Sequence, residues 1–100
     1  MNVMSEDEYL AQLNQQKHMY YWCLINVGSF SLNKAKNEAE KLYKYEHQTE
    51  GYRWLIFHDD AWHWAMLKIH GEQYWLKDPN LENESKEYSQ EWLSYDAANS

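Results

Sequence analysis

The chain has 100 residues, enough for one domain, and we treat residues 1–100 as a single unit whose last residues, 96–100, are expected to fray. Its formal net charge of −7 leaves it without the basic surface that phosphate binding needs, so nucleic acid is excluded as an expected partner. Its one cysteine, Cys23, allows neither an internal disulfide nor a thiol-based zinc site, which favours a reducing cytoplasmic location.

The beginning of the chain gives no sign of a targeting or membrane segment. The first eighteen residues are polar and acidic, and the longest apolar run, Met19–Ile25, is far too short to span a bilayer. We therefore expect no signal peptide and no membrane partner.

The first predicted element is a helix over Glu6–Lys17. Ser5 and Glu8 have the spacing of a capping box, in which each side chain accepts a hydrogen bond from the other residue's backbone amide. The next segment, Met19–Val27, is nearly all apolar and bulky, and Gly28 and Ser29 follow it. Its short length and aromatic residues favour a strand buried on both faces, although a buried helix has the same pattern.

A second helix is predicted over Leu32–His47, with Ser31 as its N-cap. Its apolar residues recur at the spacing of one helical face: Leu32, Ala35, Ala39, Leu42 and Tyr43. Lysine and glutamate alternate on the other side, as on a helix that faces solvent.

The segment from Tyr52 to Pro79 predicts three consecutive strands, at about Tyr52–His58, Ala61–His70 and Gln73–Lys77. The pairs Asp59-Asp60 and Gly71-Glu72 have the composition of tight hairpin turns. A last helix is expected over about Glu84–Tyr95. The order α-β-α-β-β-β-α predicts an α+β fold in two layers, with a roughly four-stranded antiparallel sheet packed against two or three helices.

Alternation along these strands would place large apolar side chains on both faces of the sheet. One face would carry an aromatic set that we interpret as a binding surface: Phe57, Trp62, Trp64, Met66 and Trp75. Trp and Tyr dominate the energetically important residues of protein interfaces. The alternative is that the first and last helices of the same chain cover this face.

Two sets of side chains have the composition of a reactive site. Cys23, His63 and Asp78 are the residue types of a thiol hydrolase, in which an imidazole oriented by a carboxylate deprotonates the thiol. Cys23 lies inside an apolar segment rather than at a helix N-terminus, which favours a buried structural thiol.

His58 and His63, with Asp59 and Asp60 between them, have the types of ligand that bind zinc or another divalent ion. Their spacing matches no established metal site, and two aspartates are common in turns. The chain also lacks a glycine-rich phosphate loop, so no cofactor is expected.

These observations favour a small acidic binding protein without enzymatic activity, which self-associates as a homodimer. Residues 78–100 carry a net charge of −5 and would attract a basic protein partner, as inhibitor and immunity proteins of this size do. Two alternatives stay open. One is a hydrolase that uses Cys23, His63 and Asp78, or a metal at His58 and His63. The other is a pocket for a small aromatic ligand, lined by Trp62, Trp64 and Trp75.

Overall fold

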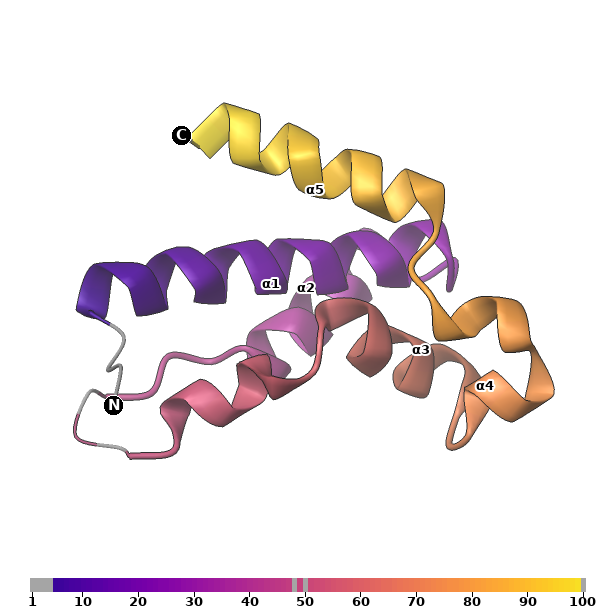
Figure 1. Cartoon of the computed structure of the whole chain (residues 1–100), viewed down its shortest axis with the longest axis horizontal. Helices are drawn as coiled ribbons and strands as arrows, with labels where there is room; N and C mark the ends of the chain where they lie inside the picture. Colours follow the sequence, from indigo (N-terminus) through magenta and orange to yellow (C-terminus); the bar gives the residue numbers. More distant parts are fainter. Residues whose placement is uncertain (1–4, 48, 50, 100) are drawn as a thin grey trace.

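The computed structural model describes residues 5–47, 49 and 51–99, and all the regular secondary structure within them is helical (Figure 1). The α-helices are α1 (Glu6–Asn26), α2 (Leu32–Leu42), α3 (Ala61–His70), α4 (Tyr74–Lys77) and α5 (Lys86–Asn99). Two 3₁₀ helices, η1 (Arg53–His58) and η2 (Pro79–Glu82), precede α3 and follow α4. The predicted α+β fold is therefore wrong.

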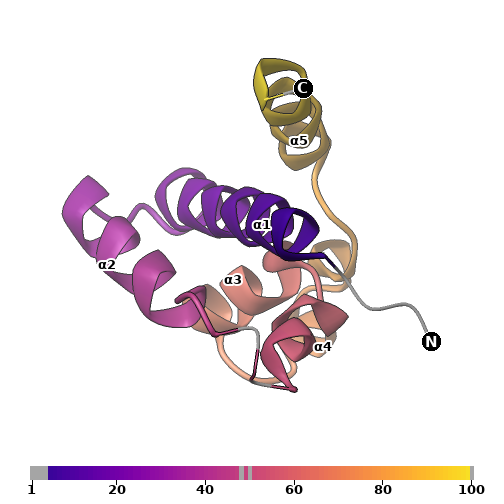
Figure 2. The same ribbon diagram turned by 90° about the vertical axis from the view of Figure 1, so that its left-hand side faces the viewer.

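Helix α1 is the centre of the fold. It packs against α2, α3 and α5, and Figure 2 shows α5 on one side of α1 with α2 and α3 on the other. Its buried residues recur every three or four positions along its length: Tyr9, Leu13, Gln16, Met19, Tyr20, Cys23 and Leu24. Ser5 and Glu8 form the predicted capping box, so the start of this helix is confirmed.

The strand predicted at Met19–Val27 is the second half of α1. Neighbours lie on both sides of it: Tyr20 packs against Tyr43, which follows α2, and Trp22 packs against Tyr88 of α5. A helix covered on several sides is apolar nearly all round, and over a short stretch that pattern resembles a fully buried strand.

Helix α2 begins as predicted, with the Ser31 side chain accepting a hydrogen bond from the Lys34 amide, but it ends at Leu42 rather than at His47. Ala35 and Ala39 are buried, and these small side chains let α2 pack closely on the rest of the fold. An ion pair of 3.1 Å between Lys68 Nζ and Glu38 Oε2 joins α3 to α2 and is the largest cause that lowers the pKa of Glu38.

The three strands predicted between Tyr52 and Lys77 are also helical, as η1, α3 and α4. In α3 the buried residues are Ala61, Trp62, Ala65 and Met66, a helical rather than an alternating spacing. The supposed turns are helix ends. Asp60 is the N-cap of α3, and Gly71 ends α3 with a φ of 88°, a conformation that glycine adopts without strain.

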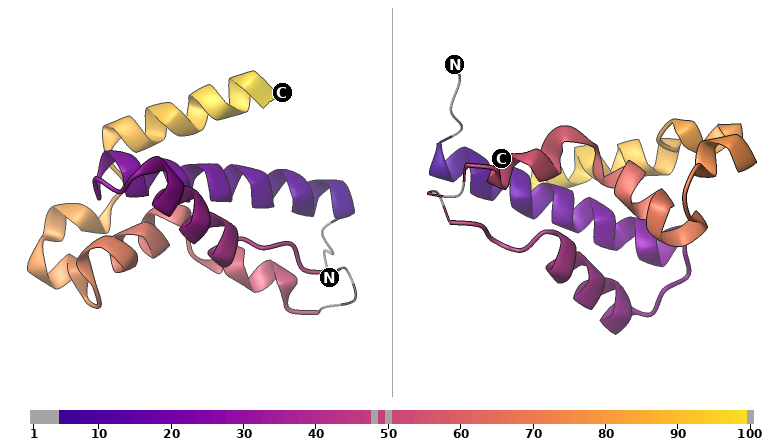
Figure 3. Two further views of the ribbon diagram at one scale, coloured as in Figure 1. Left: turned by 180° about the vertical axis from the view of Figure 1, so that it is seen from behind. Right: turned by 90° about the horizontal axis from the view of Figure 1, so that it is seen from below.

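The C-terminal helix α5 lies along α1 and is connected to η2 by the short segment 83–85 (Figures 1 and 3). It begins two residues after the predicted start and runs to Asn99, and residue 100 lies outside the described residues. Within the described part of the chain, no helix combines the length and apolar character needed to cross a membrane.

Candidate functional site

The five residues predicted to share one sheet face lie in different surroundings. Trp62 and Met66 are buried, whereas Phe57, Trp64 and Trp75 are partly buried against the core. The Trp62 indole N–H donates to the Leu81 carbonyl oxygen at 2.8 Å. The shared face does not exist, because the segment that carries these residues is helical.

The thiol hydrolase candidates do not come together. Cys23 is fully buried in α1, and desolvation is the main cause that raises the pKa of its thiol. The His63 ring makes its hydrogen bond, of 3.0 Å from Nδ1, with the Tyr74 hydroxyl. Asp78 is exposed, and its carboxylate accepts from the Asn80 amide. Burial keeps Cys23 protonated, so it lacks the thiolate that nucleophilic attack requires.

We expect native Cys23 to resist alkylation by iodoacetamide near neutral pH and to react fully once the protein is unfolded in guanidinium. The cause is burial, which both excludes the reagent and disfavours the thiolate. Mass spectrometry of intact protein measures the modified fraction over time. Rapid modification of the folded chain would contradict a structural role for this thiol.

The residues considered for metal binding lie around the start of α3. His58 is exposed, and the Asp60 carboxylate accepts a hydrogen bond of 2.9 Å from the Tyr88 hydroxyl. No group of three or more His, Cys, Asp or Glu side chains within the described residues has the geometry to hold a metal ion.

The strongest candidate for a binding site is the surface around η1. We call the exposed side chains Tyr45, Tyr52, Trp54 and Leu55 the η1 surface. Tyr52 is 78% exposed and Trp54 is 52% exposed, which is unusual for rings of this size. Trp54 and Leu55 belong to η1, and Ile56 and Phe57 of the same helix pack against the core instead.

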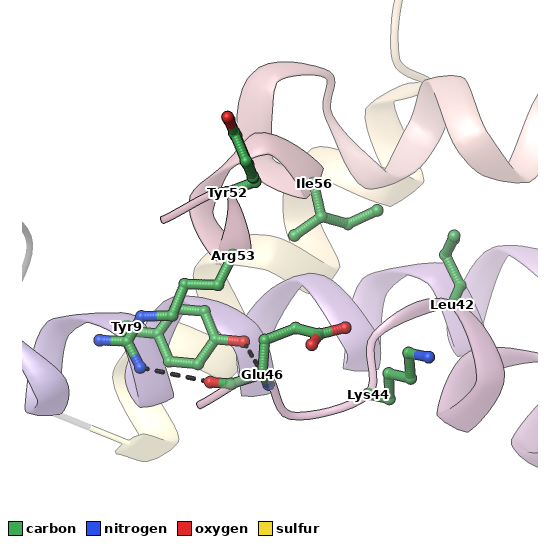
Figure 4. Close-up of a pocket in the computed structure, with 7 residues that line it drawn as sticks. All are labelled: Tyr9, Leu42, Lys44, Glu46, Tyr52, Arg53 and Ile56. Atoms are coloured by element: carbon green, nitrogen blue, oxygen red, sulfur yellow. Dashed lines mark hydrogen bonds between the residues drawn. The ribbon is translucent and has the colours of Figure 1, made fainter. Parts of the chain in front are cut away.

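A groove of about 280 Å³ lies beside the η1 surface (Figure 4). Its lining comes from α1, from the end of α2 with the segment after it, and from η1 with its N-cap residue: Tyr9, Leu42, Lys44, Glu46, Tyr52, Arg53 and Ile56. Three chain segments thus meet at one depression, with aromatic, aliphatic and charged side chains around it.

Arg53 fixes the position of η1. Its guanidinium lies 4.0 Å from the centre of the Tyr9 ring and donates from Nη1 to Glu6 Oε1 at 2.6 Å and to the Glu46 carbonyl oxygen at 3.3 Å. The Tyr9 hydroxyl in turn accepts from the Glu46 amide at 3.0 Å, and Figure 4 shows these contacts with Glu46. Cation–π and charge-assisted hydrogen bonds therefore hold η1 on the first turns of α1.

The Glu6 carboxylate is the second anchor of this surface. It accepts a hydrogen bond of 2.7 Å from the Tyr45 hydroxyl, and this bond, followed by that from Arg53, lowers the pKa of Glu6. The exposed aromatic rings are thus carried on a framework that is ordered before any partner binds, which reduces the entropy lost on binding.

Sequence reasoning missed the η1 surface, because the predicted aromatic face of the sheet included none of its four residues. The signal that indicates it is the segment YRWL at 52–55, since Tyr, Trp and Arg are the residue types enriched among interface hot spots. Comparison with known proteins finds no matching family model, no similar curated protein and no similar solved structure.

Proposed function

We propose that this protein is a small binding protein without enzymatic activity, which associates with a second copy of itself through the η1 surface. The observation that supports this most is the exposure of Tyr52 and Trp54 on an element that is firmly braced by Arg53. Exposed apolar surface is costly in water, and contiguous patches of it usually mark interfaces. The proposal includes a cytoplasmic location, which is supported by the single unpaired cysteine.

Charge favours a second copy as the occupant of this surface. The charged side chains that line or brace the groove balance, with Lys44 and Arg53 against Glu6 and Glu46. The C-terminal segment 78–100, by contrast, has a net charge of −5 and would repel its own copy. Two like copies therefore meet with least repulsion at the η1 end, and a two-fold dimer would bury the same rings on both copies.

We expect the wild-type protein to sediment as a dimer at high micromolar concentration. Trp54→Glu should raise the dissociation constant of the dimer at least about tenfold, because loss of a hot-spot aromatic side chain costs about 2 kcal/mol or more of binding free energy. Analytical ultracentrifugation over a concentration series gives both constants. The matched control is Leu93→Glu, which places the same charge on α5 at a side chain that is 66% exposed.

The control should leave the dimer unchanged, because Leu93 lies outside the η1 surface. A wild-type chain that stays monomeric throughout the series would contradict self-association. Equal weakening by the two substitutions would show that added charge, rather than loss of Trp54, is responsible.

A further inference from the structure

A second groove, of about 320 Å³, lies where the first half of α5 and the segment before it meet the N-cap of α3. It shares no residue with the η1 surface or with the groove beside that surface. Figure 1 shows the start of α5 beside the C-terminal end of α1, whereas η1 lies toward the other end. The residues that line the second groove are Asp60, Glu84, Tyr88, Ser89, Trp92 and Leu93. These described residues supply two carboxyl groups and two aromatic rings, and none of them is a lysine, arginine or histidine.

The aromatic side of this groove is held in place by the core. Tyr88 is 3% exposed, and its ring lies edge-on to Trp62 at 5.5 Å and to Trp22 at 6.3 Å between ring centres. The Trp92 ring lies 6.4 Å from the Tyr88 ring, one turn further along α5, and packs in part against the core. Aromatic faces attract a cation, and tryptophan does so most strongly. The groove therefore offers a cation an ordered aromatic surface.

Asp60 adds a carboxylate whose position is fixed. Its Oδ1 accepts a hydrogen bond of 2.9 Å from the Tyr88 hydroxyl. Its other oxygen, Oδ2, is buried and accepts no hydrogen bond from the described residues. The ion pairs within the described part of the chain involve neither Asp60 nor Glu84. A buried carboxylate oxygen without a donor or a cation beside it costs free energy, and a cation bound in the groove would offset that cost.

The segment around the groove is acidic as well. Residues 78–100 have a net charge of −5, and Lys86, the one cation among them, does not line the groove. Three acidic side chains of this segment are exposed outside the groove: Asp78, Glu82 and Glu87. Negative charge thus extends beyond the groove itself. A chain that carries several cations would gain more from this surface than a single small ion would.

Arginine is the side chain that matches both parts of the lining. Its planar guanidinium stacks on aromatic rings and donates paired hydrogen bonds to a carboxylate, whereas lysine offers a point charge. A second copy of this chain does not have a free arginine to donate. Arg53 is the only arginine in the sequence, and its side chain is 9% exposed and paired with Glu6. The occupant is therefore a different protein.

We propose that this groove binds an arginine side chain of a basic protein partner, with the guanidinium on the Trp92 ring and its charge facing Asp60 and Glu84. The acidic segment 78–100 attracts the partner, and the groove selects the arginine. This activity goes beyond the self-association proposed above and does not depend on it, because the two surfaces share no residue.

Fluorescence anisotropy tests the proposal, with a fluorescein-labelled peptide in which glycine and arginine alternate as the probe. We expect the wild-type chain to bind this peptide at low ionic strength, and the affinity to fall as salt is added. The same peptide with citrulline in place of arginine should not bind, since citrulline keeps the shape of the side chain but lacks its charge. N-acetylarginine amide should compete far more weakly than the peptide. Equal affinity of the two would overturn the choice of a protein partner and assign the groove to a free small cation.

Two substitutions in the groove should weaken binding of the peptide by different routes. Trp92→Leu removes the ring and Glu84→Gln removes a charge, and each should raise the dissociation constant by about three- to tenfold. The matched controls are Trp54→Leu and Glu87→Gln, which make the same changes at exposed side chains outside the groove. Both controls should leave the affinity for the peptide close to that of the wild-type chain.

The proposal is overturned if the wild-type chain does not bind the arginine peptide at low ionic strength, or if it binds the citrulline peptide equally well. Equal weakening by Glu84→Gln and Glu87→Gln would also overturn it, because the acidic segment as a whole would then be responsible. Glu84 is exposed, so Glu84→Gln keeps the test intact if Trp92→Leu does not fold. Trp54→Leu separates the two proposals, since it should weaken self-association through the η1 surface and leave binding of the peptide unchanged.

Discussion

Replacing Trp62 with alanine should lower the free energy of unfolding by about 3–5 kcal/mol, the range for truncating a large aromatic side chain in a core. The Trp62 side chain is 4% exposed, packs edge-on against Tyr88 and donates to the Leu81 carbonyl oxygen. It therefore joins α3 to both η2 and α5. Chemical denaturation, followed by circular dichroism at 222 nm, measures the loss.

Trp54→Ala is the natural comparison, because it removes the same side chain from a site that is 52% exposed. We expect a change within about 0.5 kcal/mol, as for surface substitutions away from special contacts. The sheet prediction placed Trp62, but not Trp54, among the side chains of the binding surface, so it would not predict a larger loss of stability for Trp62→Ala. Equal losses in the two variants would contradict the packing described above.

Helix starts were the part of the fold that the sequence could predict well. Ser5 and Ser31 are N-caps in the structure as predicted, because a cap is a local interaction between a side chain and an amide three residues later. The ends were predicted less well. Helix α2 stops at Leu42 although the residues beyond it are compatible with a helix. The segment after it is instead held at Glu46 by Tyr9, which lies 37 residues earlier, and by Arg53, seven residues later.

The sheet was predicted because aromatic and β-branched residues favour strands and because short apolar runs do not distinguish a strand from a buried helix. In Ala61–His70 the decisive contacts are not local. The first amide of α3 is bonded to Gln16 of α1, and Lys68 pairs with Glu38 of α2. Tertiary contacts of this kind override weak local preferences, and no pattern within the segment reveals them.

The candidate binding surface also depends on long-range contacts. Tyr52 and Trp54 have the composition of an interface, but their exposure follows from the way Arg53 is held against Tyr9 and Glu6, more than forty residues earlier. A strand at this position would have turned alternate residues inward. The composition of the chain could therefore indicate that it has an interface. Only the folded structure shows which residues are exposed to form it.

Gln16 is the other residue whose role only the fold reveals. It is buried in the middle of α1, and its Oε1 accepts a hydrogen bond of 2.9 Å from the Ala61 amide, the first of α3. The side chain of Asp60, the N-cap residue of α3, makes no capping hydrogen bond and instead accepts from Tyr88. Gln16 thus supplies from another helix the acceptor that an N-cap usually supplies locally.

Gln16→Met keeps the shape of the side chain but removes this acceptor, leaving a buried amide without a partner. We expect the free energy of unfolding to fall by about 1–3 kcal/mol, the cost of one unsatisfied buried group. Amide exchange should also quicken in the first turn of α3 more than in α2. Denaturation and exchange measured on the same sample separate the global loss from the local one.

Gln12→Met is the matched control, since it makes the same substitution one turn earlier on α1 at a side chain that is only partly buried. It should change stability by less than about 0.5 kcal/mol. If Gln16→Met proved as mild as this control, the amide of Ala61 would not depend on Gln16, and α3 would have to be positioned by its apolar face alone. A loss confined to Gln16→Met would instead show that one polar side chain sets where α3 begins and how it sits against α1.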